Sequence, residues 1–289
     1  MTKINKKDIN LYDTLFSGQT FRMNLEEDKS ITVILNDRVV NLKQSGNYLI
    51  IDSDNLINIK NIMNTYLDLN RDYQSINNEL LLINPLLKND LLKCKGYKVL
   101  KQDKFEMFIT YIISQNNNVK RITNIVNRMS EKYGRKVIFR NKEYYLFPTF
   151  DKLKNLTKEE FRSLGLGFRD EYLVSALNKL NEDKDFLNKL EKLSTEEALK
   201  ELTNIKGIGT KVASCILLFA YSRFDTFPID TWVRKYISEH YNIKDDIKTI
   251  SEYMKNNYNQ YSGLVIQYFY HVERNKKDWT FQRNVLKLN

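Results

Sequence analysis

Lys211 is the residue of this sequence whose position most directly suggests chemistry. It follows a turn that contains Gly207 and Gly209, and it opens an apolar segment that predicts a helix from Thr210. A cation is mildly unfavourable at a helix start, because the helix dipole is positive there. A neutral amine is a nucleophile that forms Schiff bases with aldehyde-like carbons. Lys211 is therefore a candidate nucleophile, and an exposed lysine that contacts phosphate is the alternative.

Such an amine must first lose its proton. At a pKa of about 10.4, roughly one lysine in 2,500 is neutral at pH 7. Reaching a pKa of about 7–8 requires roughly 4 kcal/mol, whereas the helix dipole supplies at most about 2 kcal/mol. Burial in a pocket must supply the remainder, or an acceptor must remove the proton during the reaction. Cys215 lies four residues after Lys211 and shares its helix face.

Asp230 is the second candidate for chemistry. It lies nineteen residues after Lys211, behind a proline and an isoleucine, at the expected start of another helix. A carboxylate there would accept amide hydrogen bonds as an N-cap, which is a sufficient role for a lone aspartate. The residue types alone leave the structural and the catalytic roles open.

The turn before Lys211 is suited to hold a phosphate. Gly207 and Gly209 permit left-handed backbone angles and the close approach of another backbone. The amides that follow them open the next helix and have no partner within it. The pattern favours a turn that binds DNA phosphate over an ordinary connection between helices.

The overall charge is consistent with a nucleic-acid partner. The chain has 46 basic and 36 acidic residues, a net charge of +10 and a pI near 9.3. This excess favours a polyanionic partner, with nucleic acid as the first candidate; a merely soluble, lysine-rich chain is the alternative. A length of 289 residues suggests about two domains.

The composition excludes two classes of site. Cys94 and Cys215 form neither a disulfide framework nor a four-cysteine cluster, and His240 and His271 are too few for a histidine-based metal site. We therefore expect no cofactor and no metal. The N-terminus lacks an apolar signal core and no segment approaches a membrane span. We expect no membrane association and a cytoplasmic protein, nucleoid-associated if bacterial.

The elements that must position these residues fall into two parts. β-rich runs with turn residues between them predict an antiparallel meander over residues 30–52, with residues 17–23 as a further strand or the entry to a strand. Helical patterns follow, and the β-containing part ends near residues 96–102. We expect an α+β fold, in which residues 1–100 form an antiparallel β-sheet domain with helices. Residues 101–289 are expected to form a mostly α-helical region of two lobes, with a hairpin at 202–220.

Nearly all of the second part has helical periodicity. Capping boxes at Thr157–Glu160 and Ser194–Glu197 mark the starts of two helices. Residues 135–148 predict a small β-hairpin. The two candidate residues for chemistry would therefore both stand at helix starts within one helical body.

Five segments of the chain occur in an order that is known from one protein family. They are SGQTFR (17–22), the segment with the asparagine triplet (96–122), LGLGFRDEYL (164–173), IKGIGTKVASCILL (205–218) and YSGLVIQYFYHVER (261–274). Together they resemble the 8-oxoguanine DNA glycosylase/AP lyase family of the helix-hairpin-helix (HhH-GPD) superfamily. The missing four-cysteine cluster fits this branch and differs from its endonuclease III and adenine glycosylase relatives.

The resemblance implies a bifunctional enzyme of DNA base-excision repair. It would remove 8-oxoguanine from double-stranded DNA, preferably opposite cytosine, and cleave the strand by β-elimination. Lys211 would attack C1′ and form an imine, while Asp230 would stabilise the oxocarbenium-like charge and assist proton transfer. A nearby carboxylate raises a lysine pKa, so we expect proton loss within the enzyme–DNA complex. A monomer is expected.

The resemblance also implies a pocket for an extruded base. The carbonyl of Gly18 would accept the N7 hydrogen that 8-oxoguanine has and guanine lacks, and Cys215 and Tyr270 would enclose the base. Cys215 as ordinary helix core is the alternative. The family often reads the base edge with a glutamine on its last helix. Ile266 stands at that place here, and Gln267 follows it about 100° around the helix.

Four residues match the group that faces the opposite strand. Asn116 would fill the vacated space, and Phe168 would wedge the base stack. Arg121 and Arg169 would donate hydrogen bonds to the unpaired cytosine, because arginine offers only donors. Phosphate-binding arginines and an asparagine helix cap are the alternative.

The phosphate contacts and the identity of the lesion complete the expectations. Trp232 stands where the family often has a histidine that touches phosphate, beside the expected contacts of Gly207 and Gly209. A glycosylase of the same fold with another damaged-base preference is the second hypothesis, and Ile266 keeps it open. A non-catalytic DNA-binding protein is the third. It is disfavoured because phosphate binding alone requires no aspartate beside the lysine.

Overall fold

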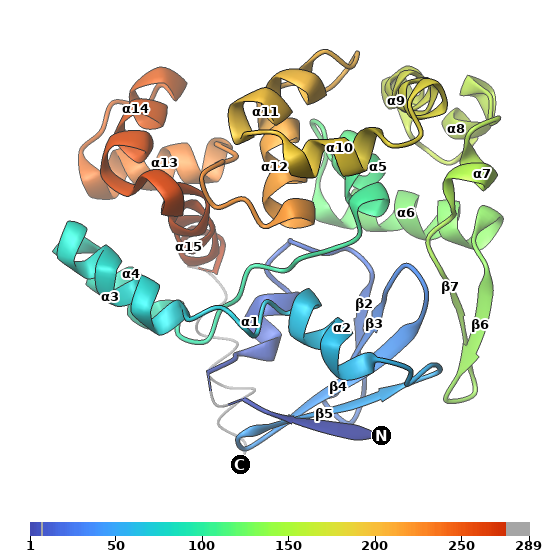
Figure 1. Cartoon of the computed structure of the whole chain (residues 1–289), viewed down its shortest axis with the longest axis horizontal. Helices are drawn as coiled ribbons and strands as arrows, with labels where there is room; N and C mark the ends of the chain where they lie inside the picture. The colour runs from blue at the N-terminus through green and yellow to red at the C-terminus, as the bar shows by residue number, and fades with distance from the viewer. Residues whose placement is uncertain (7, 276–289) are drawn as a thin grey trace.

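The chain forms an antiparallel sheet followed by a largely helical body (Figure 1). This computed structural model describes residues 1–6 and 8–275. The expected α+β class is confirmed. The end of the expected helical region, residues 276–289, lies outside the described residues.

The N-terminal sheet has the strand order β1-β5-β4-β3-β2, and each neighbouring pair is antiparallel. Its strands are β1 (Thr2–Asn5), β2 (Met23–Leu25), β3 (Ile31–Ile34), β4 (Val39–Ser45) and β5 (Tyr48–Ser53). The last three are the expected meander. Val33, Leu42 and Ile51 are fully buried and share a core with Met63 of α2 (Ile59–Tyr66). This sheet is therefore the base on which the N-terminal wall of the site is built.

Residues 17–22 form a turn that leads directly into β2, so the strand entry expected there is found and a separate strand is not. The short helix α1 (Leu11–Leu15) leads into the turn, and β2 starts only at Met23. Gly18 adopts a φ of 85°, a left-handed conformation that is open to glycine. Such a residue interrupts an extended strand, which explains why β2 begins only after the turn.

Gln19 ties this turn to the connection between the two parts of the chain. Its side-chain Nε2 donates to the carbonyl of Lys98 at 2.9 Å, and its Oε1 accepts from the amide of Leu100 at 2.8 Å. Its own carbonyl accepts from Nε2 of Gln102 at 2.8 Å, and the amide of Gln102 donates to the carbonyl of Phe219 at 2.7 Å. The turn is thus joined through the connection to the helical body.

Two central helices organise that body, namely α5 (Lys104–Ile113) and α12 (Thr210–Tyr221). They pack against each other, with the rings of Tyr111 and Phe219 stacked at 5.4 Å between their centroids. Every residue of α12 from Val212 onward is buried. Only the first turn of α12, which carries Lys211, is exposed.

Two groups of helices surround this pair (Figure 1). The first group contains α6 (Val119–Tyr133), α7 (Phe150–Leu153), α8 (Lys158–Ser163), η2 (Gly167–Arg169), α9 (Asp170–Glu182), α10 (Phe186–Lys192) and α11 (Thr195–Thr203). The second group contains α13 (Thr231–Tyr241), α14 (Ile247–Tyr258), η3 (Asn259–Tyr261) and α15 (Ser262–Asn275), against which α3 (Tyr73–Ile83), η1 (Pro85–Leu87) and α4 (Lys88–Lys93) pack. Both expected capping boxes are present, at the starts of α8 and α11. Within the described ranges, no helix combines the length and apolarity needed to span a membrane.

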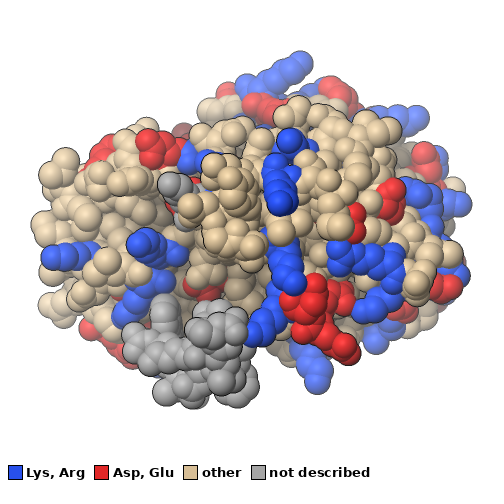
Figure 2. Space-filling model, turned by 90° about the horizontal axis from the view of Figure 1, so that it is seen from below, with Lys and Arg blue, Asp and Glu red and all other residues tan. Residues whose placement is uncertain are grey.

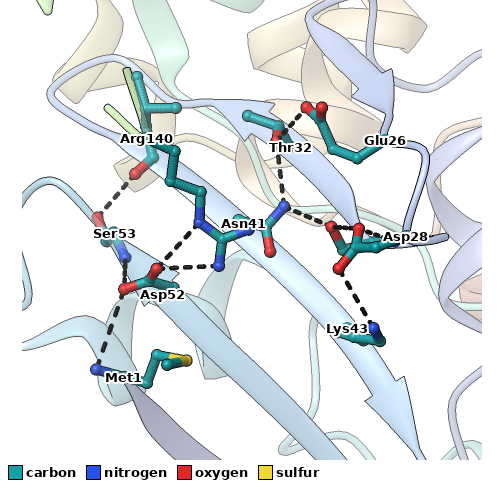
Figure 3. A network of polar contacts seen from close by, with 11 residues as sticks. Met1, Glu26, Asp28, Thr32, Asn41, Lys43, Asp52, Ser53 and Arg140 are labelled. Atoms are coloured by element: carbon teal, nitrogen blue, oxygen red, sulfur yellow. Dashed lines mark hydrogen bonds and ion pairs between the residues drawn. The ribbon is translucent and has the colours of Figure 1, made fainter. Parts of the chain in front are cut away.

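The expected small hairpin is formed by β6 (Lys136–Phe139) and β7 (Lys142–Tyr145). It contacts the N-terminal sheet through two ion pairs. Arg140 donates from Nε and Nη2 to the carboxylate of Asp52 at 3.1 and 2.9 Å, and Lys142 donates to Glu26 at 2.7 Å. Figure 3 shows Arg140 directed at Asp52 of β5. The hairpin therefore bridges the helical body and the sheet at their outer edge.

Candidate active site

An open cleft of about 900 Å³ lies where the N-terminal turn meets the helical body. It is bounded by the loop after α5, the starts of α12 and α13, and α15. Most of the site residues expected from the sequence line this cleft: Gly18, Asn116, Phe168, Gly209, Lys211, Cys215, Asp230, Trp232, Ile266, Gln267 and Tyr270. The other three, Arg121, Arg169 and Gly207, are not among the residues that line it.

Lys211 is exposed to solvent in this cleft. Its pKa is raised first by Cys215 and also by Asp230, while partial burial acts in the opposite direction. The amine is therefore protonated in the free protein. Of the two routes to a neutral amine, burial in a preformed pocket is not realised. The other route, removal of the proton by an acceptor, is the one that this geometry allows.

Asp230 caps α13 and also borders the cleft. Its Oδ1 accepts a hydrogen bond from the amide of Val233 at 2.9 Å. Burial raises the pKa of its carboxyl, whereas the amide bond of Val233 and the charge of Lys211 lower it. The cap uses one oxygen of the carboxylate, and the charge of Asp230 still raises the pKa of Lys211. The structural role therefore does not exclude a catalytic one.

Three different surfaces converge beyond the lysine. Cys215 is 3% exposed, and burial raises the pKa of its thiol, which is neutral at pH 7. Tyr270 is half-buried on α15. Gly18 presents bare backbone beside it, because a Cβ built on Gly18 would lie 3.4 Å from the Tyr270 hydroxyl oxygen. A thiol, an aromatic ring and a backbone edge thus line one space.

Ile266 and Gln267 both line the cleft. Ile266 is fully buried, and Gln267 is 6% exposed. The side-chain Oε1 of Gln267 accepts a hydrogen bond from the Tyr97 hydroxyl at 3.5 Å. The contact of Ile266 or Gln267 with a bound base remains a prediction.

Arg169 is 2% exposed and is bonded to main-chain carbonyls. Its Nε donates to Gln115 at 2.7 Å, Nη2 donates to Gln115 and to Asn116 (2.8 Å to Asn116), and Nη1 donates to Leu166 at 3.0 Å. Its guanidinium carbon lies 4.3 Å from the centre of the Phe168 ring. Arg169 therefore fastens the loop before α9 to the asparagine triplet, a role that the sequence did not indicate.

The other opposite-strand candidates surround this arginine. Asn116 has a φ of 44° and is exposed, and Phe168 is 52% exposed. Arg121 is also exposed and makes a 3.3 Å hydrogen bond from Nη2 to the carbonyl of Gly165. Burial and the charge of Arg121 lower the pKa of Arg169, so the two cations lie near each other. We call Asn116, Arg121, Phe168 and Arg169 the opposite-strand cluster.

The two hairpin glycines differ. Gly207 has a φ of 87°, and a Cβ there would lie 2.1 Å from the Tyr172 ring carbon Cγ. Gly209 has a φ of −89° and open space around the position of a Cβ. The expected left-handed geometry therefore holds for Gly207 only, and close packing against Tyr172 is its second requirement. The free space lies at Gly209, the N-cap of α12.

At three residues that line the cleft, the structure adds to what the sequence indicated. Trp232, an expected phosphate contact, is 49% exposed at the start of α13. Phe21 and Arg274 also line the cleft, and neither was expected. Arg274 lies one helical turn after Tyr270, and this spacing is the only sequence signal that marks it.

On the face of the molecule seen from below, charge alone does not mark a nucleic-acid interface. Figure 2 shows Lys and Arg mainly on the right half of the face seen from below, with Asp and Glu among them. In the part of the chain that the structure describes, no group of three or more His, Cys, Asp or Glu side chains is placed to hold a metal ion. The cleft is therefore defined by its shape and its side chains.

Two family models together match most of the chain. The model for "8-oxoguanine DNA glycosylase, N-terminal domain" matches residues 1–108. The model for "HhH-GPD superfamily base excision DNA repair protein" matches residues 109–259.

Individual proteins are similar over shorter or longer spans. An N-glycosylase/DNA lyase OGG1 of Arabidopsis thaliana is 35% identical over 143 residues, which are 48% of this chain and 39% of that protein. An N-glycosylase/DNA lyase of Saccharomyces cerevisiae is 29% identical over 180 residues, 58% of this chain and 48% of that protein. The chain thus spans about half the length of the curated relatives that it matches.

A solved structure matches nearly the whole chain. It is the Clostridium acetobutylicum 8-oxoguanine glycosylase/lyase in complex with double-stranded DNA that contains cytosine opposite 8-oxoguanine. The TM-score is 0.88 at 33% identity, and the match covers 95% of this chain and 98% of that one.

Proposed function

The chain belongs to the 8-oxoguanine DNA glycosylase family within the HhH-GPD superfamily, and from this premise we propose that it is a bifunctional enzyme of base-excision repair. It removes 8-oxoguanine from double-stranded DNA, preferably opposite cytosine, and then cleaves the strand. The protein acts as a monomer. Its substrate places it in the compartment that holds DNA, which fits the expected cytoplasmic or nucleoid location.

One observation carries this proposal. Lys211, an amine at a helix start, is exposed in a cleft together with a carboxylate, Asp230, that acts on its pKa. Cys215, Tyr270 and the backbone of Gly18 bound the same cleft. Phosphate binding alone requires none of these three surfaces. A nucleophile beside a slot for a flat base supports base excision.

The proposed reaction begins with nucleophilic attack. The Lys211 nitrogen bonds to C1′ while the N-glycosidic bond breaks, and the bonding pair leaves with the base, which takes up a proton. Asp230 stabilises the positive charge that develops on the sugar. The adduct loses an amine proton, and the nitrogen lone pair then forms the C1′=N bond as the C1′–O4′ bond breaks and O4′ takes up a proton, which gives a ring-opened imine. Loss of a C2′ proton then expels the 3′ phosphate, which is β-elimination.

The surrounding residues have positioning roles in this proposal. Cys215 and Tyr270 enclose the extruded base, the carbonyl of Gly18 accepts its N7 hydrogen, and Gln267 or Ile266 meets its edge. The opposite-strand cluster faces the unpaired cytosine. The open space at Gly209 receives a backbone phosphate, and the indole N–H of the exposed Trp232 is a second donor for phosphate.

A borohydride-trapping assay on a panel of lesion duplexes tests the proposal. Wild-type protein should form a trapped covalent complex with 8-oxoguanine opposite cytosine and should excise less opposite adenine. K211Q should bind the duplex and trap nothing. K206Q, which removes a neighbouring exposed lysine paired with Glu171, is the matched control and should trap normally. Trapping by K211Q would contradict the assignment of the nucleophile.

A second candidate function rests on Ile266. The apolar side chain at this place favours no particular base edge, so a glycosylase with another damaged-base preference would share the cleft. Excision of a different lesion in the same panel, with 8-oxoguanine left intact, would support that function instead. Binding without excision of any lesion would favour a non-catalytic DNA-binding protein.

A further inference from the structure

Arg274 is a cation at the wall of the cleft that has no assigned role. It lies on α15, four residues after Tyr270, and therefore on the same helix face. It is half-buried and lines the cleft that also contains Lys211 and Cys215. Its position places a positive charge beside the space proposed for the base.

The guanidinium of Arg274 lies directly against the turn at Gly18. Its Nη1 donates to the carbonyl of Phe16 at 3.0 Å. A Cβ built on Gly18 would lie 3.0 Å from Nη1 and 3.8 Å from the guanidinium carbon. The absence of a side chain at Gly18 is therefore what lets Arg274 approach the backbone. This contact positions the guanidinium at the edge of the cleft.

The described neighbours of Arg274 use only part of its hydrogen-bonding capacity. Among residues 1–6 and 8–275, no carboxylate forms an ion pair with it, and the bond to Phe16 occupies one of its five N–H donors. Burial and then the charge of Arg274 lower the pKa of the neighbouring His271 to about 4, so that histidine is neutral at pH 7. The remaining donors are available to an acceptor in the cleft.

We propose that Arg274 donates a hydrogen bond to a carbonyl oxygen of the extruded oxidised purine and so contributes to selection of the base. The inference rests on the proposed function, which supplies the ligand. 8-Oxoguanine carries carbonyl oxygens at O6 and O8, and arginine is a donor without an acceptor. Ile266 offers no hydrogen bond from the same helix. Gln267 and the Tyr270 hydroxyl are the other polar groups of α15 at the cleft, and Arg274 is the cation among them.

Single-turnover assays on two duplexes test this role. R274Q should excise 8-oxoguanine about 10- to 100-fold more slowly than wild type, the effect of losing a hydrogen bond from a charged group. R274K keeps a donor and should recover part of the rate. On a duplex with an abasic site, which places no base in the cleft, R274Q should cleave the strand at the wild-type rate.

A matched variant and the wild type separate the explanations. R140Q removes the same charge from the distant β6–β7 hairpin and should leave excision unchanged. Equal losses on the lesion and the abasic duplexes would overturn the inference, because they indicate a structural effect through Phe16; so would undiminished excision by R274Q. If wild-type protein excises no 8-oxoguanine, the proposed function fails. If wild type excises and R274Q matches it, only the present inference fails.

Discussion

The base-side cleft and the opposite-strand cluster hold their charged groups in different ways. In the cleft, Lys211 is exposed and interacts with Cys215 and Asp230. In the cluster, the guanidinium of Arg169 is buried and bonded to three main-chain carbonyls. The first arrangement leaves its reactive group open to a ligand, whereas the second already uses four of its five N–H donors.

This difference bears on what DNA must do to each region. On the base side, bound DNA needs only to cover the cleft, because the side chain of Lys211 already faces the space that the DNA would enter. Four of the five N–H donors of Arg169 are bonded within the described residues, so to donate more than one hydrogen bond to an unpaired cytosine it must give up a bond to Gln115, Asn116 or Leu166. The exposed Arg121 has no such cost. We infer that the base side is preorganised and that the opposite-strand side rearranges on binding.

The largest effect that can sharpen the comparison is expected from D230N. Asparagine is as good an N-cap as aspartate, so stability should be kept, but the rate of imine formation should fall about 100-fold with the loss of charge stabilisation. Asp230 raises the pKa of Lys211. Its removal lowers that pKa, so the rise of the rate with pH should move to lower pH. Borohydride trapping measured across pH checks both effects, and an unmoved profile would mean that Asp230 does not control the proton.

The next effect is expected from R169Q, with R121Q as its comparison. R169Q removes donors from buried carbonyls and should lower the free energy of unfolding by about 1–3 kcal/mol. It should also reduce the preference for cytosine over adenine about 10-fold, the range for one lost base contact. R121Q should reduce this preference without loss of stability. If R169Q unfolds more easily but keeps its opposite-base preference, Arg169 belongs to the scaffold alone.

The smallest effect on the rate of base excision is expected from substitutions at the two hairpin glycines, Gly207 and Gly209. G207A forces a Cβ against the Tyr172 ring and should lower the free energy of unfolding by about 1–3 kcal/mol. G209A meets open space and should keep stability while it weakens binding to undamaged duplex DNA. Thermal unfolding and a binding titration distinguish the two. Equal losses of stability would contradict the difference in their surroundings.

Local patterns were sufficient for much of this molecule. The capping boxes before α8 and α11, the β6–β7 hairpin and the helix starts at Thr210 and Asp230 depend on neighbouring residues, and the sequence predicts them. The pKa of Lys211 is raised, as expected beside a carboxylate, although Cys215 contributes more to the increase than Asp230 does. These features need no knowledge of distant contacts.

Long-range contacts explain what the sequence could not predict. The turn at Gly18 depends on hydrogen bonds between Gln19 and residues 98–102, and the sequence indicated only a strand or the entry to a strand there. The bonds of Arg169 to the asparagine triplet and the approach of Arg274 to Gly18 join segments that are far apart in the chain. The domain boundary at residue 100 stays a prediction.

The hydrogen bonds of Gln19 bear on whether the N-terminal sheet can be exchanged without damage to the site. They join the Gly18 wall of the cleft to Gln102, and through it to Phe219 of α12. The sheet is therefore not an interchangeable module. A chimera that replaced residues 1–100 with an unrelated sheet would keep the lysine and lose the Gly18 wall of the cleft. The two parts are expected to be inherited together, because the site exists only at their junction.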